Sequence, residues 1–145
     1  MTQNERFYGE YAHAIDDKGR IIIPAKLRNL FGDEFYITKG FDNCLAVYPK
    51  ERWEEFMTKL SALPKSVKRN RQLSRHFTAS ACKCEPDKNG RIIISQSLKE
   101  FAALSKEIVS IGSNDCIEIW DKKAWEEYNA EYDNSAVDLD FEIDF

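Results

Sequence analysis

The chain has 145 residues, of which 43% are hydrophobic and 12% aromatic, so it can bury an ordinary core without disulfides or a structural metal. No apolar run approaches the roughly 18 residues that cross a bilayer, which excludes a membrane-spanning helix. The net charge of −4 does not exclude a nucleic-acid partner, because residues 121–145 hold nine acidic residues and two lysines, leaving 19 basic against 16 acidic residues in positions 1–120.

The predicted elements occur in the same order twice along the chain. Each copy has a strand, a charged turn, a short strand, a brief helix, a two-stranded hairpin and a longer amphipathic helix. Pro24 is expected at the first helical position of one brief helix, and Ser95 is expected to cap the other. These elements cover 9–15, 20–23, 24–32, 34–40, 45–49 and 50–60 in the first copy, and 79–85, 91–94, 95–104, 107–112, 116–120 and 122–132 in the second.

One face of each longer helix is apolar, with side chains at helical spacing. An aromatic stripe of this kind is compatible with a cofactor-binding face, but coverage of the open end of a small barrel is the favoured interpretation. We therefore assign the stripe to the core. Its members are Trp53, Phe56, Met57 and Leu60 in the first copy, and Trp125, Tyr128 and Tyr132 in the second.

The stretch 61–84, which connects the copies, has six basic residues and no acidic residue. Most of it is predicted to be helical after Pro64. Direct binding of phosphates and pairing with an acidic surface of the same or a neighbouring chain both remain open. The basic residues are Lys65, Lys68, Arg69, Arg71, Arg75 and Lys83.

The two copies match in one continuous order, which indicates an internal duplication. Four short strands and a turn of helix cannot bury both faces of a sheet, so we expect each copy to complete the core of the other in a small pseudo-twofold barrel. Similar surfaces can also pair between chains, so a closed ring or another symmetric oligomer is expected. The matching pairs include Asp16/Asp87, Gly19/Gly90, Arg20/Arg91, Ile21/Ile92, Gly40/Gly112, Cys44/Cys116 and Trp53/Trp125.

The charged turn is the motif that fold alone does not explain. A hairpin turn needs the glycine for a positive φ and the aspartate for its hydrogen bonds, but it needs no arginine directly after the glycine. One interpretation is an exposed ion pair between Asp16 and Arg20, repeated in the second copy, which would contribute roughly 0 to 1 kcal/mol. The other is a guanidinium held at the rim of the fold to contact phosphate oxygens or guanine. The presence of arginine in both of two diverged copies favours the second.

Further basic residues lie near these turns in the sequence. Lys18, Lys26 and Arg28 are expected to add positive charge beside the first turn, and Lys88 and Lys99 beside the second. The first turn therefore has the more basic surroundings.

The sequence favours neither a metal centre nor an enzyme. "CKC" at Cys82 and Cys84 is not a C-x-x-C pair, so we expect all four cysteines to be buried, inert and reduced, as in a cytosolic protein without a signal peptide. Nothing in the sequence pairs His13 or His76 with a nucleophile. No metal, cofactor or small-molecule substrate is expected.

The segments "GEYAHAIDDKGRIIIPAKLR" and "DKNGRIII" resemble the MraZ family of bacterial transcriptional regulators, over nearly the whole folded chain. The resemblance implies an α+β, mainly β fold: a pseudo-twofold swapped-hairpin (AbrB-like) barrel of two tandem repeats with flanking helices. The second copy departs from the family pattern, because "ISQSLK" replaces the usual proline and arginine. The implied parts are a first repeat with its helix (7–60), a basic helical connector (61–78), a second repeat with its helix (79–132) and an acidic tail (133–145) that is either mobile or docked on a basic face.

The resemblance also implies a function. It is that of a cytoplasmic, nucleoid-associated and ring-forming regulator, expected to be a repressor, that binds short direct repeats of double-stranded DNA in its own promoter and controls the division and cell-wall gene cluster. A ring-forming protein-interaction scaffold is the alternative, and a metal-dependent enzyme using Cys82, Cys84 and His76 is a third reading. The expected DNA-binding residues are Asp16, Lys18, Arg20, Lys26, Arg28, Asp87, Lys88 and Arg91.

Overall fold

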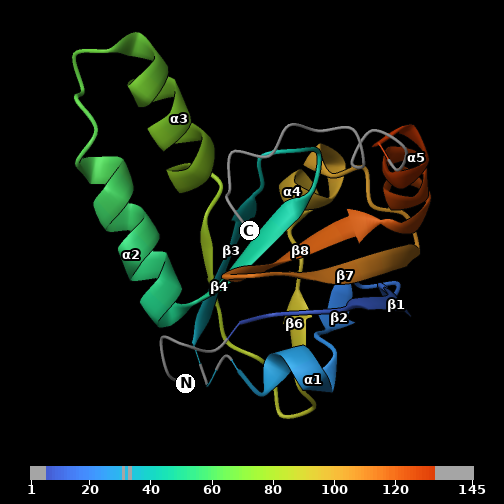
Figure 1. Ribbon diagram of the computed structural model, residues 1–145. Helices are drawn as coiled ribbons and strands as arrows, with labels where there is room; N and C mark the ends of the chain where they lie inside the picture. Colours follow the sequence, from blue (N-terminus) through green and yellow to red (C-terminus); the bar gives the residue numbers. More distant parts are fainter. Residues whose placement is uncertain (1–5, 31, 33, 133–145) are drawn as a thin grey trace, which may run out of the picture.

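The computed structural model describes residues 6–30, 32 and 34–132, and the acidic tail lies outside this range. The predicted order of elements is confirmed in both copies, with one connecting helix between them (Figure 1). The first copy contains β1 (Glu10–Ala14), β2 (Arg20–Ile22), α1 (Ala25–Arg28), β3 (Phe35–Lys39), β4 (Leu45–Pro49) and α2 (Lys50–Ser61). The connector contains α3 (Lys68–Thr78), and the second copy contains β5 (Cys82–Cys84), β6 (Arg91–Ile93), α4 (Gln96–Phe101), β7 (Glu107–Ser113), β8 (Cys116–Asp121) and α5 (Lys122–Tyr132).

The strands of the two copies interleave in a mixed α/β fold. A six-stranded antiparallel sheet has the order β1-β7-β8-β4-β3-β5, so the first strand of each copy lies beside the hairpin of the other. The short strands β2 and β6 pair only with each other in a second sheet. Each copy thus completes the other, as expected, while the swapped-hairpin barrel implied by the family resemblance stays a prediction.

The isoleucine runs after the charged turns fill the centre of the molecule. Ile21, Ile23 and their counterparts in the second copy are almost fully buried, whereas Ile22 is 46% and Ile93 69% exposed. Successive side chains of a strand point to opposite faces, so three isoleucines in a row cannot all be buried by one core. The core includes Phe7, Ile21, Ile23, Leu27, Phe35, Ile37, Leu45, Val47, Ile92, Ile94, Leu98, Ile108, Ile117 and Ile119.

The two brief helices begin differently. Ser95 caps α4, because its hydroxyl accepts a hydrogen bond from the Leu98 N–H at 3.3 Å, as predicted. Pro24 occupies the cap position of α1 rather than its first helical position, which corrects the sequence prediction by one residue. With φ at −50° and ψ at 136°, Pro24 is still extended, so the helix begins after it.

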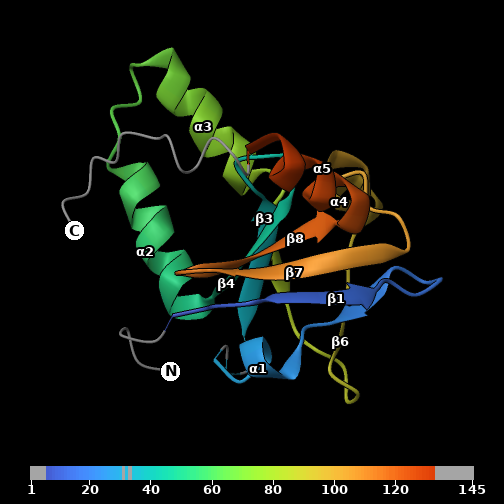
Figure 2. The same cartoon turned by 45° about the vertical axis from the view of Figure 1, so that its right-hand side comes forward.

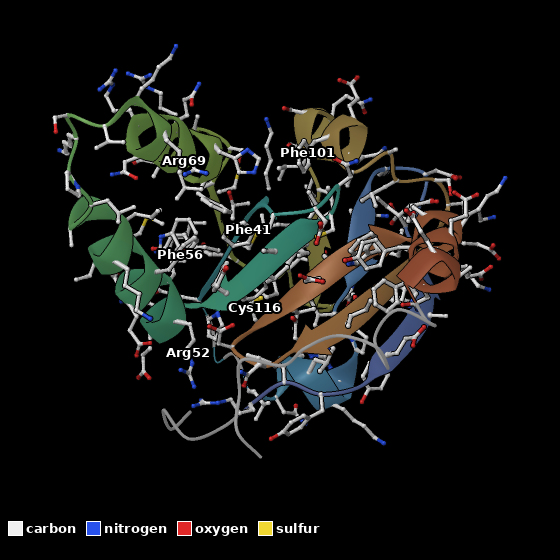
Figure 3. All side chains as sticks on the ribbon, turned by 45° about the horizontal axis from the view of Figure 1, so that its top comes forward. Phe41, Arg52, Phe56, Arg69, Phe101 and Cys116 are labelled. Carbon is white, nitrogen blue, oxygen red and sulfur yellow. The ribbon has the colours of Figure 1, made fainter. Side chains whose placement is uncertain are left out.

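The aromatic stripe is buried more deeply in the first copy than in the second. Trp53 and Leu60 of α2 are buried, and Phe56 packs against the same cluster as Tyr48 and Trp53 (Figure 3). Trp125 and Tyr128 of α5 are half-buried, as Phe56 is, and their ring centroids lie 5.2 and 5.0 Å from that of the buried Trp120. The second stripe therefore packs on the sheet as expected, although less deeply than Trp53; the Tyr132 side chain lies outside the described residues.

The four cysteines differ in their burial. Cys44, Cys84 and Cys116 are buried, and burial raises the pKa of Cys84 and of Cys116 to about 12, so these thiols stay protonated. Cys82 is exposed, which contradicts the expected burial of all four. It stands at the start of β5, a strand at the edge of the sheet that pairs on one side only. Among the described residues, no group of three or more potential ligands could hold a metal ion. No helix in that part of the chain is long and apolar enough to cross a membrane.

Gly112 in β7 lies where the N-terminal segment runs alongside this strand in close contact. A Cβ at this position would meet the backbone nitrogen of Tyr8 and stand 2.6 Å from the carbonyl carbon of Phe7. Both neighbours are backbone atoms, held by paired hydrogen bonds between Phe7 and Asn114. Gly112→Ala is therefore expected to lower the free energy of unfolding by about 1 to 3 kcal/mol. Urea denaturation measures this change, and an unaltered midpoint would contradict the close approach of the Phe7–Tyr8 backbone to Gly112.

His13 in β1 gives stability a pH dependence. Its Nε2 lies 2.7 Å from the Ser110 hydroxyl, a contact that the sequence did not predict. Ser110 is completely buried, so the pair is not accessible to a substrate. Burial lowers the pKa of His13 below its ordinary 6.5. As the pH falls, His13 is protonated at a higher pH in the unfolded chain than in the folded chain. The free energy of unfolding is therefore largest above about pH 6.5 and falls as the pH drops below that value. Urea unfolding at about pH 7.5 and about pH 5.5 should show this loss, and His13→Gln, which keeps a polar partner for Ser110, should reduce it.

Candidate nucleic-acid interface

The first charged turn is held by one carboxylate. Oδ1 of Asp16 accepts the backbone N–H of Lys18 at 2.9 Å and of Arg20 at 2.8 Å, and Oδ2 accepts Nε–H of Arg20 at 2.7 Å. Gly19 has φ at +75°, the left-handed conformation that the turn requires. Asp16 therefore fixes both the backbone and the arginine that leaves the turn.

The second turn repeats this geometry. Asp87 accepts the backbone N–H of Asn89 at 2.8 Å and of Arg91 at 2.9 Å, and Nε–H of Arg91 at 2.8 Å, while Gly90 has φ at +79°. Backbone hydrogen bonds from Arg91, and less strongly from Asn89, lower the pKa of Asp87 despite its partial desolvation, and the equivalent bonds do so for Asp16. Both carboxylates thus stay ionised and oriented at neutral pH.

The ion pair and the displayed arginine, posed as alternatives by the sequence, occur together. Each aspartate binds its arginine through Nε, the inner nitrogen of the guanidinium. Among the described residues, neither arginine donates from a terminal nitrogen to a further partner. The side chains of Arg20 and Arg91 are 26% and 30% exposed, so the tips of both forks remain accessible.

The antiparallel pairing of β2 with β6 brings the two turns together. Arg20 pairs with Ile93 and Ile22 with Arg91, while Ile21 and Ile92 pair between them and face the core. Alternation along the strands places the other four side chains on the outer face. We call this set, Arg20, Ile22, Arg91 and Ile93, the Arg–Ile ribbon. Sequence reasoning found its arginines and missed its isoleucines; the signal was that a run of three isoleucines must expose the middle one.

The basic residues of the brief helices are arranged crosswise. A Cβ on Gly90 would stand 2.9 Å from Nη1 of Arg28, so Arg28 lies over the turn of the other copy. Lys99 lies over the first turn, with Nζ 3.8 Å from a Cβ placed on Gly19. The sequence expectation that each helix serves its own turn is therefore wrong, because interleaving of the copies exchanges them. Lys18, Lys26 and Lys88 are exposed around the turns.

A hollow of about 340 Å³ adjoins the ribbon on the side of β5. Arg20, Arg91 and Ile93 line it, together with Cys82 and Lys83. The Lys83 ammonium already lies 3.1 Å from a carboxylate oxygen of Glu34, and this hydrogen bond raises the pKa of Lys83. The hollow is therefore a feature of the same surface rather than a separate charged site.

The basic connector does not join this surface. Helix α3 stands at the end of the molecule that also carries α4 and α5, whereas α1, β2 and β6 lie toward the other end (Figures 1 and 2). Within one chain, its basic side chains therefore do not adjoin the turn arginines.

The fold and the site define a tandem-repeat protein whose two copies exchange strands and together present an arginine-bearing ribbon. A family model described as "MraZ protein, putative antitoxin-like" matches residues 6–76 and again residues 77–140. The chain belongs to the MraZ family.

Its relatives match over nearly their full length. A protein of Thermoanaerobacter pseudethanolicus named Transcriptional regulator MraZ is 46% identical over 136 residues, which cover 94% of this chain and 95% of that protein. Proteins of the same name from Clostridium beijerinckii and Acetivibrio thermocellus are 49% and 47% identical, each covering 92% of this chain and 92% and 93% of their own length.

Proposed function

We propose that this chain is a sequence-specific DNA-binding transcriptional regulator, acting as a repressor. The observation that carries the proposal is the Arg–Ile ribbon, on which two oriented arginines from different copies share one exposed face. The name of the relatives, Transcriptional regulator MraZ, supports it. The proposed DNA-binding residues are Asp16 and Asp87, which position the arginines, and the contact residues Lys18, Arg20, Lys26, Arg28, Lys88 and Arg91, joined by Ile22 and Ile93.

A two-stranded ribbon has the dimensions to enter the major groove of B-DNA. There, an arginine fork donates to O6 and N7 of guanine, and an apolar side chain contacts the methyl group of thymine. Asp16 and Asp87 do not contact the DNA in this arrangement. They hold the guanidinium through Nε, so each arginine is already ordered before it binds. Binding therefore costs less side-chain conformational entropy.

One ribbon is too small for a regulator's specificity. A bidentate arginine–guanine contact gives about 1 to 3 kcal/mol of discrimination, so two contacts must be repeated along the DNA. We propose that chains with a swapped-hairpin core assemble into a closed ring, which presents several ribbons to short direct repeats upstream of the division and cell-wall gene cluster. The protein would act in the cytoplasm, at the nucleoid, without enzymatic activity.

A footprint of the purified protein on the DNA upstream of its own gene tests the proposal. Protection at regularly spaced short repeats is expected, with an affinity that falls steeply with salt, because each neutralised phosphate adds about 0.9 to the slope of log K against log salt concentration. Uniform binding along the DNA, or binding without salt dependence, would instead favour the ring-forming scaffold.

A further inference from the structure

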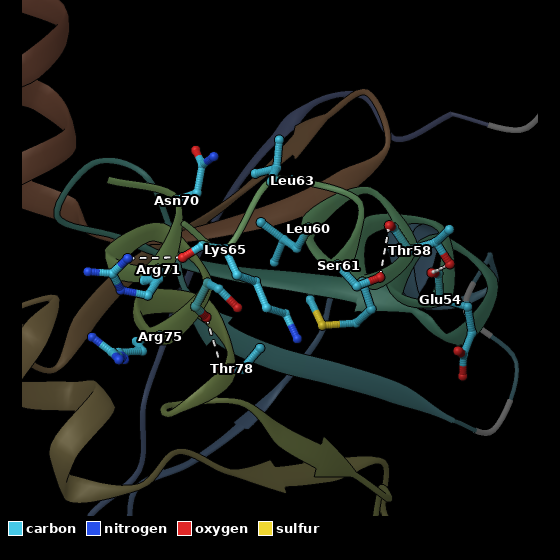
Figure 4. Close-up of a pocket in the computed structure, with 12 residues that line it drawn as sticks. Glu54, Thr58, Leu60, Ser61, Leu63, Lys65, Asn70, Arg71, Arg75 and Thr78 are labelled. Carbon is cyan, nitrogen blue, oxygen red and sulfur yellow. Dashed lines mark hydrogen bonds between the residues drawn. The ribbon is translucent and has the colours of Figure 1, made fainter. Parts of the chain in front are cut away.

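A groove between α2 and α3 is separate from the ribbon and has no role in the proposed DNA contact. It has a volume of about 530 Å³ and runs between the two helices (Figure 4). Met57, Leu60 and Leu63 form its apolar floor, and Lys65, Arg71 and Arg75 stand along its walls, while Glu54 is its one acidic lining residue. The groove thus combines an apolar floor with a net positive rim.

The positive charge of this rim is not neutralised within the described part of the chain. Lys65 and Arg75 make no ion pair with a described residue, and Arg71 donates through Nη1 to the backbone oxygens of Lys65 and Ser66. A partner that supplies apolar side chains can cover the floor, while its carboxylates pair with these cations at the solvent-exposed rim. The groove therefore selects an acidic, amphipathic ligand.

The chain carries such a segment at its own C-terminus. Residues 137–145, "VDLDFEIDF", alternate strictly between an apolar and an acidic residue. In an extended conformation this alternation places valine, leucine, isoleucine and phenylalanine on one face and four carboxylates on the other. We infer that residues 137–145 dock in the α2–α3 groove of the same chain, with apolar side chains on the floor and carboxylates reached by the long side chains of the rim.

The groove and the Arg–Ile ribbon differ in whether their arginines already have carboxylate partners. Arg20, Arg91 and Lys83 around the ribbon already pair with Asp16, Asp87 and Glu34, so an acidic ligand there would have to compete with three existing carboxylates. Rim residues of the groove face no such competition among the described residues.

The segment is also long enough to reach. Residues 133–145 span up to about 45 Å when extended, compared with a radius of gyration of about 15 Å for a compact chain of this length. Helices α5 and α3 both lie toward the end of the molecule opposite to α1 (Figures 1 and 2). Docking within one chain therefore requires no rearrangement of the described fold.

Photo-crosslinking in the full-length chain tests the docking. With p-benzoylphenylalanine at position 141, mixed with isotopically labelled chain to separate links within and between chains, illumination should join position 141 to α2 or α3 of the same chain. Links to β2 or β6, links between chains, or no link would each overturn the inference. This readout needs no DNA, so it fails or succeeds independently of the proposed function.

Charge reversal in the groove provides the matched comparison. Lys65→Glu with Arg75→Glu should lower the crosslink yield about fivefold, since two exposed ion pairs together contribute about 1 kcal/mol. Both side chains are exposed, so the fold should be retained, as circular dichroism would verify. Lys68→Glu with Arg69→Glu is the control, because it changes the net charge equally and both residues are exposed on α3 without lining the groove; it should leave the yield unchanged. Equal loss in the control would show a non-specific attraction and contradict the groove.

Discussion

Replacing both turn arginines, Arg20→Ala with Arg91→Ala, is expected to weaken binding to the operator by about 30-fold or more, because each lost contact with guanine removes about 1 to 3 kcal/mol. Each single variant should show a smaller loss, and in an oligomer the losses accumulate over every ribbon that touches the DNA. Fluorescence anisotropy with a labelled operator duplex at fixed salt measures the change.

The comparison that identifies the cause is binding to unrelated DNA. Loss of guanine readout should reduce operator binding far more than non-specific binding, whereas loss of a phosphate contact reduces both alike. Both arginines are partly exposed and their turns are held mainly by the backbone bonds of Asp16 and Asp87, so thermal stability should change little. If operator affinity survived in a folded double variant, the ribbon would not be the reading surface.

Phe77→Ala is expected to give the largest loss of stability, about 3 to 5 kcal/mol. Phe77 is completely buried at the end of α3, with its ring centroid 4.8 Å from that of Phe56 and 4.9 Å from that of Phe41. Its backbone oxygen also accepts a hydrogen bond from the buried Thr38 hydroxyl at 2.7 Å. The substitution leaves a cavity where the connector meets the sheet, and urea denaturation measures its effect.

Phe41→Ala serves as the control for this variant. Phe41 touches the same ring but is 73% exposed, so its loss should lower stability by about 1 kcal/mol or less. Because α3 lies away from the ribbon, Phe77→Ala should still bind operator DNA under conditions in which it is folded. Similar losses in the two variants would mean that Phe77 does not anchor the connector.

Much of this architecture was predictable from sequence because the duplication doubles every local signal. Two turns of one pattern, each followed by three isoleucines, locate the hairpins and the arginines without any long-range information. Local patterns do not specify partners, however. Nothing within α1 or α4 indicates that Arg28 lies over Gly90 and Lys99 over Gly19, since that depends on how the copies interleave.

The burial of Cys82 and of Trp125 also depends on neighbours in space that local patterns do not specify. Cys82 has the sequence surroundings of a buried strand residue, yet it is exposed at the first position of the edge strand β5, while Cys84 at the last position is buried. Trp125 matches Trp53 in the repeat, yet Trp125 is half-buried where Trp53 is buried. Burial is a property of the neighbourhood in space, which one-dimensional periodicity describes only where the sequence neighbours are also the packing neighbours.

Under the proposed function, the pairing of β2 with β6 has a consequence for the symmetry of the DNA sequence that the ribbon contacts. A ribbon formed by two identical polypeptides would favour a palindromic DNA site, because any substitution in one β-strand would also be present in the other. Here both strands are encoded in tandem, so each half is free to evolve its own base preference, as the exchange of Arg28 for Lys99 already illustrates. An asymmetric DNA site that recurs as a direct repeat therefore suits the proposed ribbon better than an inverted repeat does.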